Sequence, residues 1–422
     1  MDDLPGHNGR GLRGNRYFHI TFWAQACTDY CDSFLAVTLT WGALHELGGT
    51  ALGLILACWT IPRGAMLLMS GVFVDRWDRR TIAVGVSAAL GGLALGAAAV
   101  SRLHELAAWA GVAVVIGILD AFRLPVGASI LPMVVAEEHL VSANRWASLR
   151  EWSSATVGPA IGGVLVAAAG VAGAFTVAAG LYGVSCLLMI FAPRMKARAD
   201  DEEKTRVLAD LKGGFRLVAT HPRLRVLLPT FAMTNLFILG LIGVAIPVFV
   251  KDVLHAGPSG LGFLSGSFAA GVMAGTFVSP RLPARWQESQ ICLFALFALS
   301  DVLLALVGAA PVLPVACVLY FLSGLTGGPP ATYYRTMLQT LPPKEFLGRV
   351  NALARATSFG LEPVSTTAVG ALSARISASV LLLAGGGCAT CIDLFGVLSS
   401  RRAIRRGPAS AAPAQVPREV AQ

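Results

Sequence analysis

Charged residues are scarce in this chain. Only 14% of its 422 residues are Asp, Glu, Lys or Arg, whereas 55% are hydrophobic, and a soluble domain carries about 25% charged residues. Apolar runs long enough to cross a bilayer recur along the whole length, which excludes an ordinary soluble protein. The net charge of +9 is spread between these runs, so it fits orientation in a lipid bilayer better than binding of nucleic acid, and we predict no nucleic-acid partner.

Signatures of enzyme and metal sites are also missing. We find no His/Glu metal cluster, no nucleophile motif and no nucleotide-binding loop. The eight cysteines lie mostly inside apolar runs, and Cys388 and Cys391 form a CxxC within one of them, where a small-residue packing role is expected. The start of the chain is polar and shows no cleavable signal. The sequence therefore predicts no enzyme, no metal and no cofactor, and argues against driving by ATP.

The apolar runs predict twelve membrane-spanning helices, because irregular backbone cannot face lipid. The spans are expected at about 17–44, 51–73, 81–100, 107–135, 146–169, 173–192, 224–250, 261–278, 291–310, 312–337, 350–372 and 380–399. This gives an all-α membrane protein with two pseudo-symmetric six-helix bundles, 17–192 and 224–399. Residues 1–16 form a cytoplasmic tail, 193–223 a cytoplasmic linker with an amphipathic middle, and 400–422 a disordered cytoplasmic tail.

Basic residues test this map. The segments assigned to the inside hold most of the Lys and Arg residues, whereas the outside segments hold little beyond Arg102, Lys251 and Arg375. By the positive-inside rule, both termini are expected in the cytoplasm of a multi-pass protein of the plasma or inner membrane.

One polar stretch between the second and third spans is prominent: GVFVDRWDRR, residues 71–80. Gly71 lets two helices approach closely at a membrane exit. Asp75 is expected where the following helix begins, favoured by the helix dipole, while Arg76, Arg79 and Arg80 stay at the cytoplasmic surface. The functional interpretation is a latch between the two bundles on the cytoplasmic side. The alternative is a basic loop that only sets topology. A degenerate copy without the acid follows in the second half, at Gly275, Ser279 and Arg281.

This stretch resembles the loop between the second and third helices of the major facilitator superfamily of transporters, with Asp78 in place of the family's glycine. Arg123 with Gly127 resembles the family's fourth-helix pattern, and residues 158–163, GPAIGG, its exporter pattern in the fifth helix. Further stretches are similar to the branch that includes enterobactin exporters and macrolide-efflux proteins. The resemblance implies two six-helix bundles, a central cavity and alternating access, with export driven by proton entry in many relatives.

Charged groups inside spans need a reason, because each costs about 2.5–3.5 kcal/mol at a helix centre on insertion scales. Asp29 and Asp32 nearly share a helical face, so their repulsion suits a proton carrier. Arg123 is a fixed positive charge, and Asp120 is its nearest candidate partner in sequence. Glu362 precedes Pro363, where the helix can bend. The five are candidates for proton coupling or substrate contact. The alternative for Asp29 and Asp32 is that they cap or bond neighbouring helices, and for Asp120 and Arg123 it is a static structural ion pair.

Other positions are assigned to structure. Arg63, Arg150, Glu151, Asp301 and Arg355 are expected near the membrane surfaces, where long side chains reach water. Small residues and a kink in the fifth span are expected to act through helix packing; this packing motif comprises Gly158, Pro159, Gly162 and Gly163.

The sequence thus favours a proton-coupled exporter of an amphiphilic small molecule, such as a drug, an antibiotic or a siderophore. Its partners are that substrate, protons and the lipid bilayer, and we expect a monomer. One rival keeps the fold but imports a nutrient or moves a lipid. Another is a membrane enzyme or a non-transporting receptor.

Overall fold

The computed structural model describes residues 12–101, 105–195, 215–343 and 346–405, and within these the side chains of residues 71–76 and of some other helical residues lie outside the description. The described part of the chain consists of helices and short connections, without strands. Nine of its helices are long and apolar enough to cross a membrane. Large apolar side chains such as Leu187 and Phe395, about 60% exposed, lie on the outside of the molecule. This is the exterior of a multi-pass membrane protein.

The first group of helices comprises α1 (Arg16–Arg76), α2 (Arg79–Val100), α3 (Leu106–Val134) and α4 (Leu140–Ile190). At 1.5 Å per residue, 61 residues of continuous helix would be about 90 Å long, three times the hydrocarbon thickness. The chain instead leaves helical geometry at Gly48 in α1 (φ 83°) and at Gly170 in α4 (φ 71°). Glycine adopts these positive φ values without a Cβ clash, so each long helix is two segments, as the spans predicted around these positions require.

The second group follows the segment 196–214. It comprises α6 (Leu224–Gly240), η3 (Leu241–Ala245), α7 (Ile246–Val248), η4 (Phe249–Val253), α8 (Pro258–Val278), α9 (Ala284–Gln287), α10 (Gln290–Val307), α11 (Leu313–Thr340), α12 (Leu347–Ser373) and α13 (Ala378–Arg405). Short 3₁₀ turns precede α1, α4 and α9. The long helices start and end within a few residues of the predicted spans.

The span predicted at 224–250 is not a uniform α-helix. It changes to π-helix at η3 and η4, on either side of the short α7 that contains Pro247. Proline lacks an N–H and its ring clashes with the carbonyl four residues earlier, so wider turns relieve the crowding. The backbone N–H of Gly240 also donates to Ser365 Oγ at 2.7 Å. The apolar run predicted a helix, but not this local widening.

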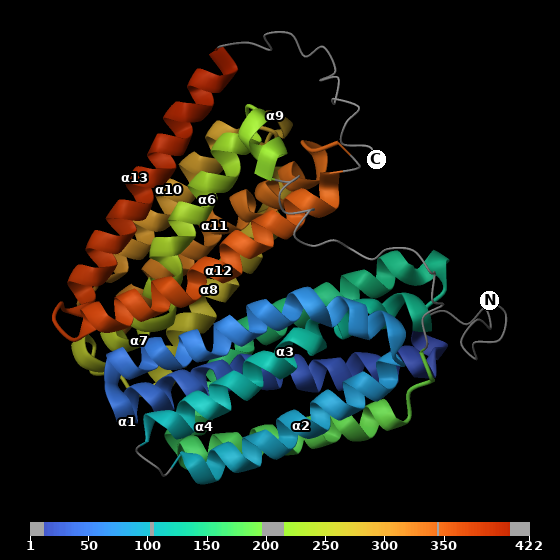
Figure 1. The fold of residues 1–422 in the computed structure, drawn as a ribbon. Helices are drawn as coiled ribbons and strands as arrows, with labels where there is room; N and C mark the ends of the chain where they lie inside the picture. Colours follow the sequence, from blue (N-terminus) through green and yellow to red (C-terminus); the bar gives the residue numbers. More distant parts are fainter. Residues whose placement is uncertain (1–11, 102–104, 196–214, 344–345, 406–422) are drawn as a thin grey trace.

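Helices pack mainly within their own group. In the first, α1 packs against α3 and α4, and α2 against α4; in the second, α8 packs against α11, α10 against α13, and α6 against α12 and α13. The groups meet through α4 with α8 and α1 with α12. Figure 1 shows them joined at one side, near the α1 and α7 labels, and diverging toward the opposite side.

Glycines permit the contact between the groups. A Cβ on Gly53 of α1 would lie 2.5 Å from the backbone oxygen of Thr366 in α12. A Cβ on Gly262 of α8 would lie 2.4 Å from the backbone oxygen of Pro159 in α4. Real Cβ atoms do not approach so closely, so these helices touch backbone to backbone. The junction therefore depends on small residues from both groups.

The polar stretch after α1 folds differently from the prediction. Helix α1 continues through Arg76, and α2 begins at Arg79 with Asp78 at its N-cap position. The prediction that Asp75 begins the following helix is therefore wrong, since Asp75 lies in the last turn of α1. Asp78 accepts hydrogen bonds from the backbone N–H of Met195 at 2.6 Å and from Thr81 Oγ at 2.9 Å. Its carboxylate meets the helix dipole and also ties α2 to the end of the first group.

Candidate functional site

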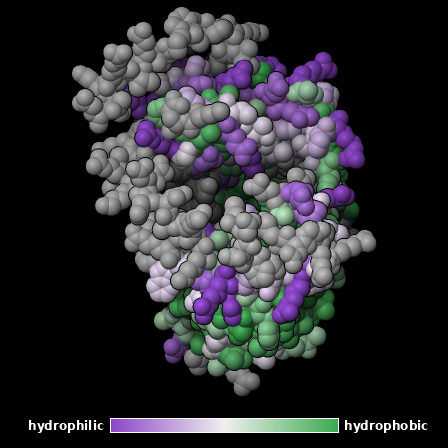
Figure 2. Space-filling view, turned by 90° about the vertical axis from the view of Figure 1, so that its right-hand side faces the viewer, coloured by the Kyte–Doolittle hydropathy of each residue, from purple (hydrophilic) through white to green (hydrophobic). Residues whose placement is uncertain are grey.

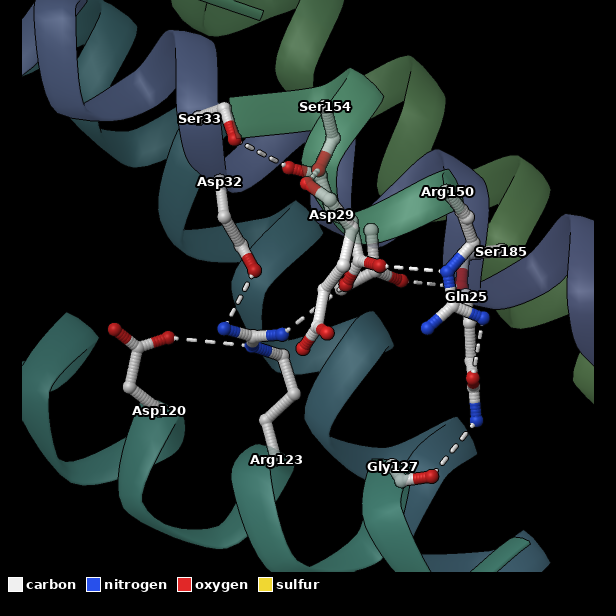
Figure 3. Close-up of polar contacts among 12 residues, drawn as sticks. Gln25, Asp29, Asp32, Ser33, Asp120, Arg123, Gly127, Arg150, Ser154 and Ser185 are labelled. Atoms are coloured by element: carbon white, nitrogen blue, oxygen red, sulfur yellow. Dashed lines mark hydrogen bonds and ion pairs between the residues drawn. The ribbon is translucent and has the colours of Figure 1, made fainter. Parts of the chain in front are cut away.

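One arginine contacts three carboxylates inside the first group of helices (Figure 3). Arg123 Nη2 lies 2.8 Å from Asp32 Oδ2, Nη1 lies 3.6 Å from Asp29 Oδ1, and Nε lies 3.4 Å from Asp120 Oδ1. The two acids of α1 sit three residues apart and so nearly share the face toward α3. Asp120 reaches the same guanidinium from one turn earlier on α3. The planar fork of arginine suits several acceptors at once.

A second arginine enters the cluster from α4. Arg150 Nε donates to Asp29 Oδ2 at 2.7 Å, and its Nη1 donates to Gln25 Oε1 at 2.6 Å. Gln25 in turn donates to the backbone oxygen of Gly127 at 3.3 Å. The arginine is largely buried, with its side chain 11% exposed. Arg150, to which the sequence assigned a structural role near a membrane surface, thus pairs with a carboxylate inside the protein.

Two aromatic residues complete the surroundings. The hydroxyl of Tyr182 on α4 donates to Asp32 Oδ1, and Trp59 Nε1 of α1 donates to Asp120 Oδ2 at 3.2 Å. The cluster now holds three carboxylates against two guanidinium groups, a formal charge of −1 when all five groups are ionised. Burial of such a set requires this dense pairing, because an unpaired charge away from water is strongly disfavoured.

The cluster borders a cavity of about 350 Å³ within the first group. Asp29, Arg123 and Arg150 line it together with Glu151, whereas Asp32 and Asp120 lie behind them, outside the lining. The remaining wall is mixed, with apolar residues of α2 and α3 and small polar residues of α1 and α4. A cavity of this size accepts a small molecule, so a solute here would meet two carboxylates, Asp29 and Glu151, and two guanidinium groups directly.

Glu362 is not part of this cluster. It lies on α12, in the second group, where its charge interacts with Arg63 of α1. The pair spans the junction between the groups, so its charges are sensitive to how the groups sit relative to each other. The expectation that Asp301 lies near a membrane surface is wrong, because this residue is 5% exposed and lies in the middle of α10.

Only part of the proposed latch can be located. The side chains of Gly71, Asp75 and Arg76 lie outside the described residues. Arg79 is 8% exposed and donates to Ser129 Oγ at 2.8 Å. Arg80 donates to the backbone oxygen of Ile190. These contacts tie the start of α2 to α3 and α4 within the first group, and the latch between groups stays a prediction.

The packing motif of the fifth span lies where three helices meet. A Cβ on Gly158 would approach Ser33 Cβ of α1 to 2.4 Å, and one on Gly162 would approach Phe34 Cβ to 2.8 Å. On the other side, a Cβ on Gly163 would lie 2.4 Å from the backbone oxygen of Pro258 in α8. Pro159 lies inside α4 and faces Gly262 with its carbonyl. The motif therefore joins α4 to both neighbours.

Comparison with known proteins decides the family. The profile described as Major Facilitator Superfamily matches residues 21–361, most of the chain. The chain belongs to the major facilitator superfamily. It resembles the uncharacterized MFS-type transporter YfiS of Bacillus subtilis (strain 168), with 26% identity over 374 residues, covering 85% of this chain and 82% of that protein. It also resembles the enterobactin exporter EntS of Escherichia coli O139:H28, with 26% identity over 332 residues, covering 75% and 76%.

A solved structure of a bacterial homologue of the iron transporter ferroportin, in an inward-facing state, has the same fold, with a TM-score of 0.66 at 16% identity over 90% of this chain and 98% of that one. This superfamily membership makes the protein a multi-pass membrane transporter rather than an enzyme. It confirms the resemblance drawn from the sequence motifs.

The sequence held a signal for Arg150. Residues 150, 154 and 158 are spaced four apart, so they share one face of α4. Because Gly158 is a close-packing glycine, that face is expected to contact a neighbouring helix. Arg150 lies two turns earlier on the same face, so it is expected near that helix too. No comparable signal pointed to Tyr182, whose hydroxyl is one of several in the apolar runs.

Proposed function

We propose that this protein is a proton-coupled exporter of an amphiphilic small molecule that works by alternating access. The observation that carries the proposal is the cluster of Asp29, Asp32, Asp120, Arg123 and Arg150 beside a cavity. Ionisable residues inside a membrane protein commonly mark proton or substrate pathways. The enterobactin exporter among the relatives is consistent with export.

The charge balance of the cluster suggests how a proton acts. With three carboxylates and two guanidinium groups, uptake of one proton makes the cluster neutral. That proton frees Arg123 from one of its partners, so the remaining contacts rearrange. Asp29 faces the cavity and Asp32 lies behind it. In this proposal Asp32 carries the proton and Asp29 meets the solute, while Arg123, which keeps its charge, couples the two.

We further propose twelve membrane crossings in two six-helix bundles, 17–192 and 224–399, linked through 193–223. The breaks at Gly48 and Gly170 divide α1 and α4 into two helical segments each, which supports two crossings for each helix. The two divisions and α12 add three crossings to the nine apolar helices of the described chain, which gives twelve. The distribution of basic residues supports a cytoplasmic location for both termini. The described junction near Gly262 and Gly53 would then close the outer side, leaving an inward-open form with the cytoplasmic latch released.

The cavity lining favours an amphiphilic substrate with a polar group. The two guanidinium groups can pair with a carboxylate, phenolate or catecholate, the carboxylates of Asp29 and Glu151 can accept hydrogen bonds from a donor group, and the apolar wall suits a hydrocarbon or aromatic body. Glu362 beside Arg63 adds a second ionisable pair near the junction. These groups support the exporter over a receptor or enzyme, neither of which needs a charge cluster that exchanges partners.

The test uses inside-out membrane vesicles with an imposed proton gradient, acidic inside. We expect a fluorescent amphiphilic dye or a catecholate siderophore to accumulate, and Asp32→Asn to abolish the dependence on the gradient. Glu288→Gln, an exposed acid at the end of α9, is the matched control and should transport normally. Accumulation that ignores the gradient would remove proton coupling. A thermal-shift screen on purified protein identifies the substrate, because a ligand of the folded state raises apparent stability.

A further inference from the structure

A second acidic site lies far from the cluster, in the other group of helices. Asp301 of α10 is 5% exposed and Asp393 of α13 is 1% exposed. The two carboxyl groups lie within hydrogen-bond contact of each other. Asp301 is the one charged residue of α10, and both acids lie in the middle of their helices, where α10 and α13 pack together.

Among the side chains that the structure describes, no basic group compensates this pair. The other charged side chains on the elements packed against α10 and α13 that the structure describes are Arg225, Lys251, Asp252, Arg285, Arg335, Arg349, Glu362, Arg401 and Arg402. None of them is among the groups that interact with either carboxyl group. Lys251 donates instead to the backbone oxygen of Leu44. Two adjacent ionised carboxylates in this setting would repel each other without screening by water or by a cation.

The remaining polar contacts show where a proton fits. Asp393 Oδ1 accepts a hydrogen bond from Thr234 Oγ of α6 at 2.8 Å. The Oδ2 atoms of Asp301 and Asp393 are both buried and have no hydrogen-bond donor in the described part of the chain. A carboxylic acid supplies the missing donor, since a protonated carboxyl group has an O–H. Asp393 is already stabilised as an acceptor by Thr234, so Asp301 is the better place for the proton.

We propose that Asp301 and Asp393 form a proton-binding site in the second group of helices, with Asp301 holding the proton and donating it to Asp393 as a hydrogen bond. The site joins α10, α13 and, through Thr234, α6. Loss of the proton leaves two adjacent negative charges and separates these helices, so the bound proton stabilises this contact. This proposal stands independently of the transport function, because it concerns a group that lies outside the cavity and its cluster.

Infrared spectroscopy of the purified full-length protein in lipid nanodiscs tests it, with the pH as the variable and protons as the only ligand. We expect a carbonyl band of a protonated carboxylic acid at neutral pH that Asp301→Asn removes. Asp32→Asn should leave this band in place, which separates the site from the transport cluster. A band that survives both Asp301→Asn and Asp393→Asn would overturn the proposal.

Stability gives a second readout that misfolding of one variant cannot mimic. In Asp301→Asn the side-chain amide donates to Asp393 as the acid does, so this variant should fold. The thermal midpoint of wild type should fall as pH rises and the shared proton is lost. The midpoint of Asp301→Asn should not show this fall. Asp301→Leu, which cannot donate, should have a lower midpoint at neutral pH. A midpoint of wild type that responds to Na⁺ at fixed pH and not to pH would assign the site to a metal cation and overturn the proposal.

Discussion

At the scale of single residues, Arg123 is the group on which the cluster depends. Its three nitrogens each face a different carboxylate, at 2.8, 3.6 and 3.4 Å. Arg150 reaches only Asp29 among these acids. Removal of Arg123 would thus leave Asp32 and Asp120 without a cation in the cluster, which makes this position the most sensitive one that the structure identifies.

We expect Arg123→Gln to destabilise the protein by about 3 kcal/mol, the lower end of the range for removing one partner of a buried ion pair, because the cavity admits water. The measurement is thermal or denaturant unfolding in detergent. Arg145→Gln, at an exposed arginine near the start of α4, is the control and should be close to neutral. Equal stability of the two variants would show that the three carboxylates do not need this guanidinium.

The hydroxyl of Tyr182 offers a finer test. The ring is 1% exposed and its hydroxyl donates to Asp32. Tyr182→Phe keeps the packing and removes the donor, so we expect a loss of about 1.5–3 kcal/mol, typical of a hydrogen bond to a charged group. Tyr334→Phe is a matched control, because the hydroxyl of Tyr334 is buried with no hydrogen-bond partner in the described part of the chain. That variant should be neutral or slightly more stable.

At the scale of elements, helix termini and glycine contacts determine how the helices begin and how they pack. Helix α6 starts after the turn that contains His221, whose Nδ1 accepts from the backbone N–H of Leu224 at 3.4 Å. This histidine lies before the first crossing of the second group. Burial, and secondly the nearby charge of Arg223, lower its pKa. The neutral ring is thus the form that the folded helix start prefers.

The pH dependence at His221 follows from that sign. Because the pKa is lower in the folded state, the neutral ring contributes stability that is present above the unfolded pKa and lost as pH falls through the folded one. Wild type should therefore lose thermal stability between about pH 8 and about pH 5, within the range where histidine titrates. His221→Asn, which keeps an acceptor but cannot titrate, should lose less over the same interval. An identical pH response in both proteins would contradict this assignment.

The contact of α4 with α8 should be sensitive to added side-chain volume. Gly262→Val places methyl groups against the backbone of Pro159 and Ala160, where even a Cβ would lie at 2.4 and 3.1 Å. The wedge should open this junction and bring the diverging ends together, shifting the population of conformations. Spin labels at Trp77 and Trp286, both exposed, should report a shorter distance.

Gly85→Val is the control for the wedge, because a Cβ at Gly85 of α2 meets nothing within 4 Å. It should leave the label distance unchanged. The same distance in both variants would mean that the α4–α8 junction does not set the separation of the two ends.

At the scale of the whole molecule, the two groups of helices meet at one side and diverge at the other (Figure 1). Figure 2 looks at the diverging side and shows hydrophilic side chains there, with a hydrophobic flank at the lower edge. A polar end beside apolar flanks is the pattern of a protein that crosses a bilayer with this end in water. The basic residues favour the cytoplasm for that end.

Orientation can be tested with a membrane-impermeant maleimide in a cysteine-free background. Trp77→Cys, between α1 and α2, should be labelled in inside-out vesicles and protected in intact cells. Ser377→Cys, in the exposed turn before α13, should show the reverse. Labelling of both from the same side would overturn the proposed topology, because the two turns lie at opposite ends of the predicted crossings.

The sequence by itself determined the class and the length of the elements. Scarcity of charge and recurrent apolar runs required membrane helices, since backbone polar groups in lipid must be satisfied within each segment. The family motifs, among them Arg123 with Gly127 and GPAIGG, were local in sequence and could be read directly. Asp120 as a partner of Arg123 followed from a separation of three residues on one helix.

Only the tertiary structure decided which distant charges meet. Arg150 and Tyr182 come from α4, far along the chain from Asp29 and Asp32, and burial brings them together because each side chain inside the protein needs a partner. The same holds for Asp301 and Asp393, ninety-two residues apart by number, each unremarkable alone in an apolar run. Hydropathy fixes where a helix crosses, but its rotation and neighbours are set by packing, and these determine which ionisable groups come into contact.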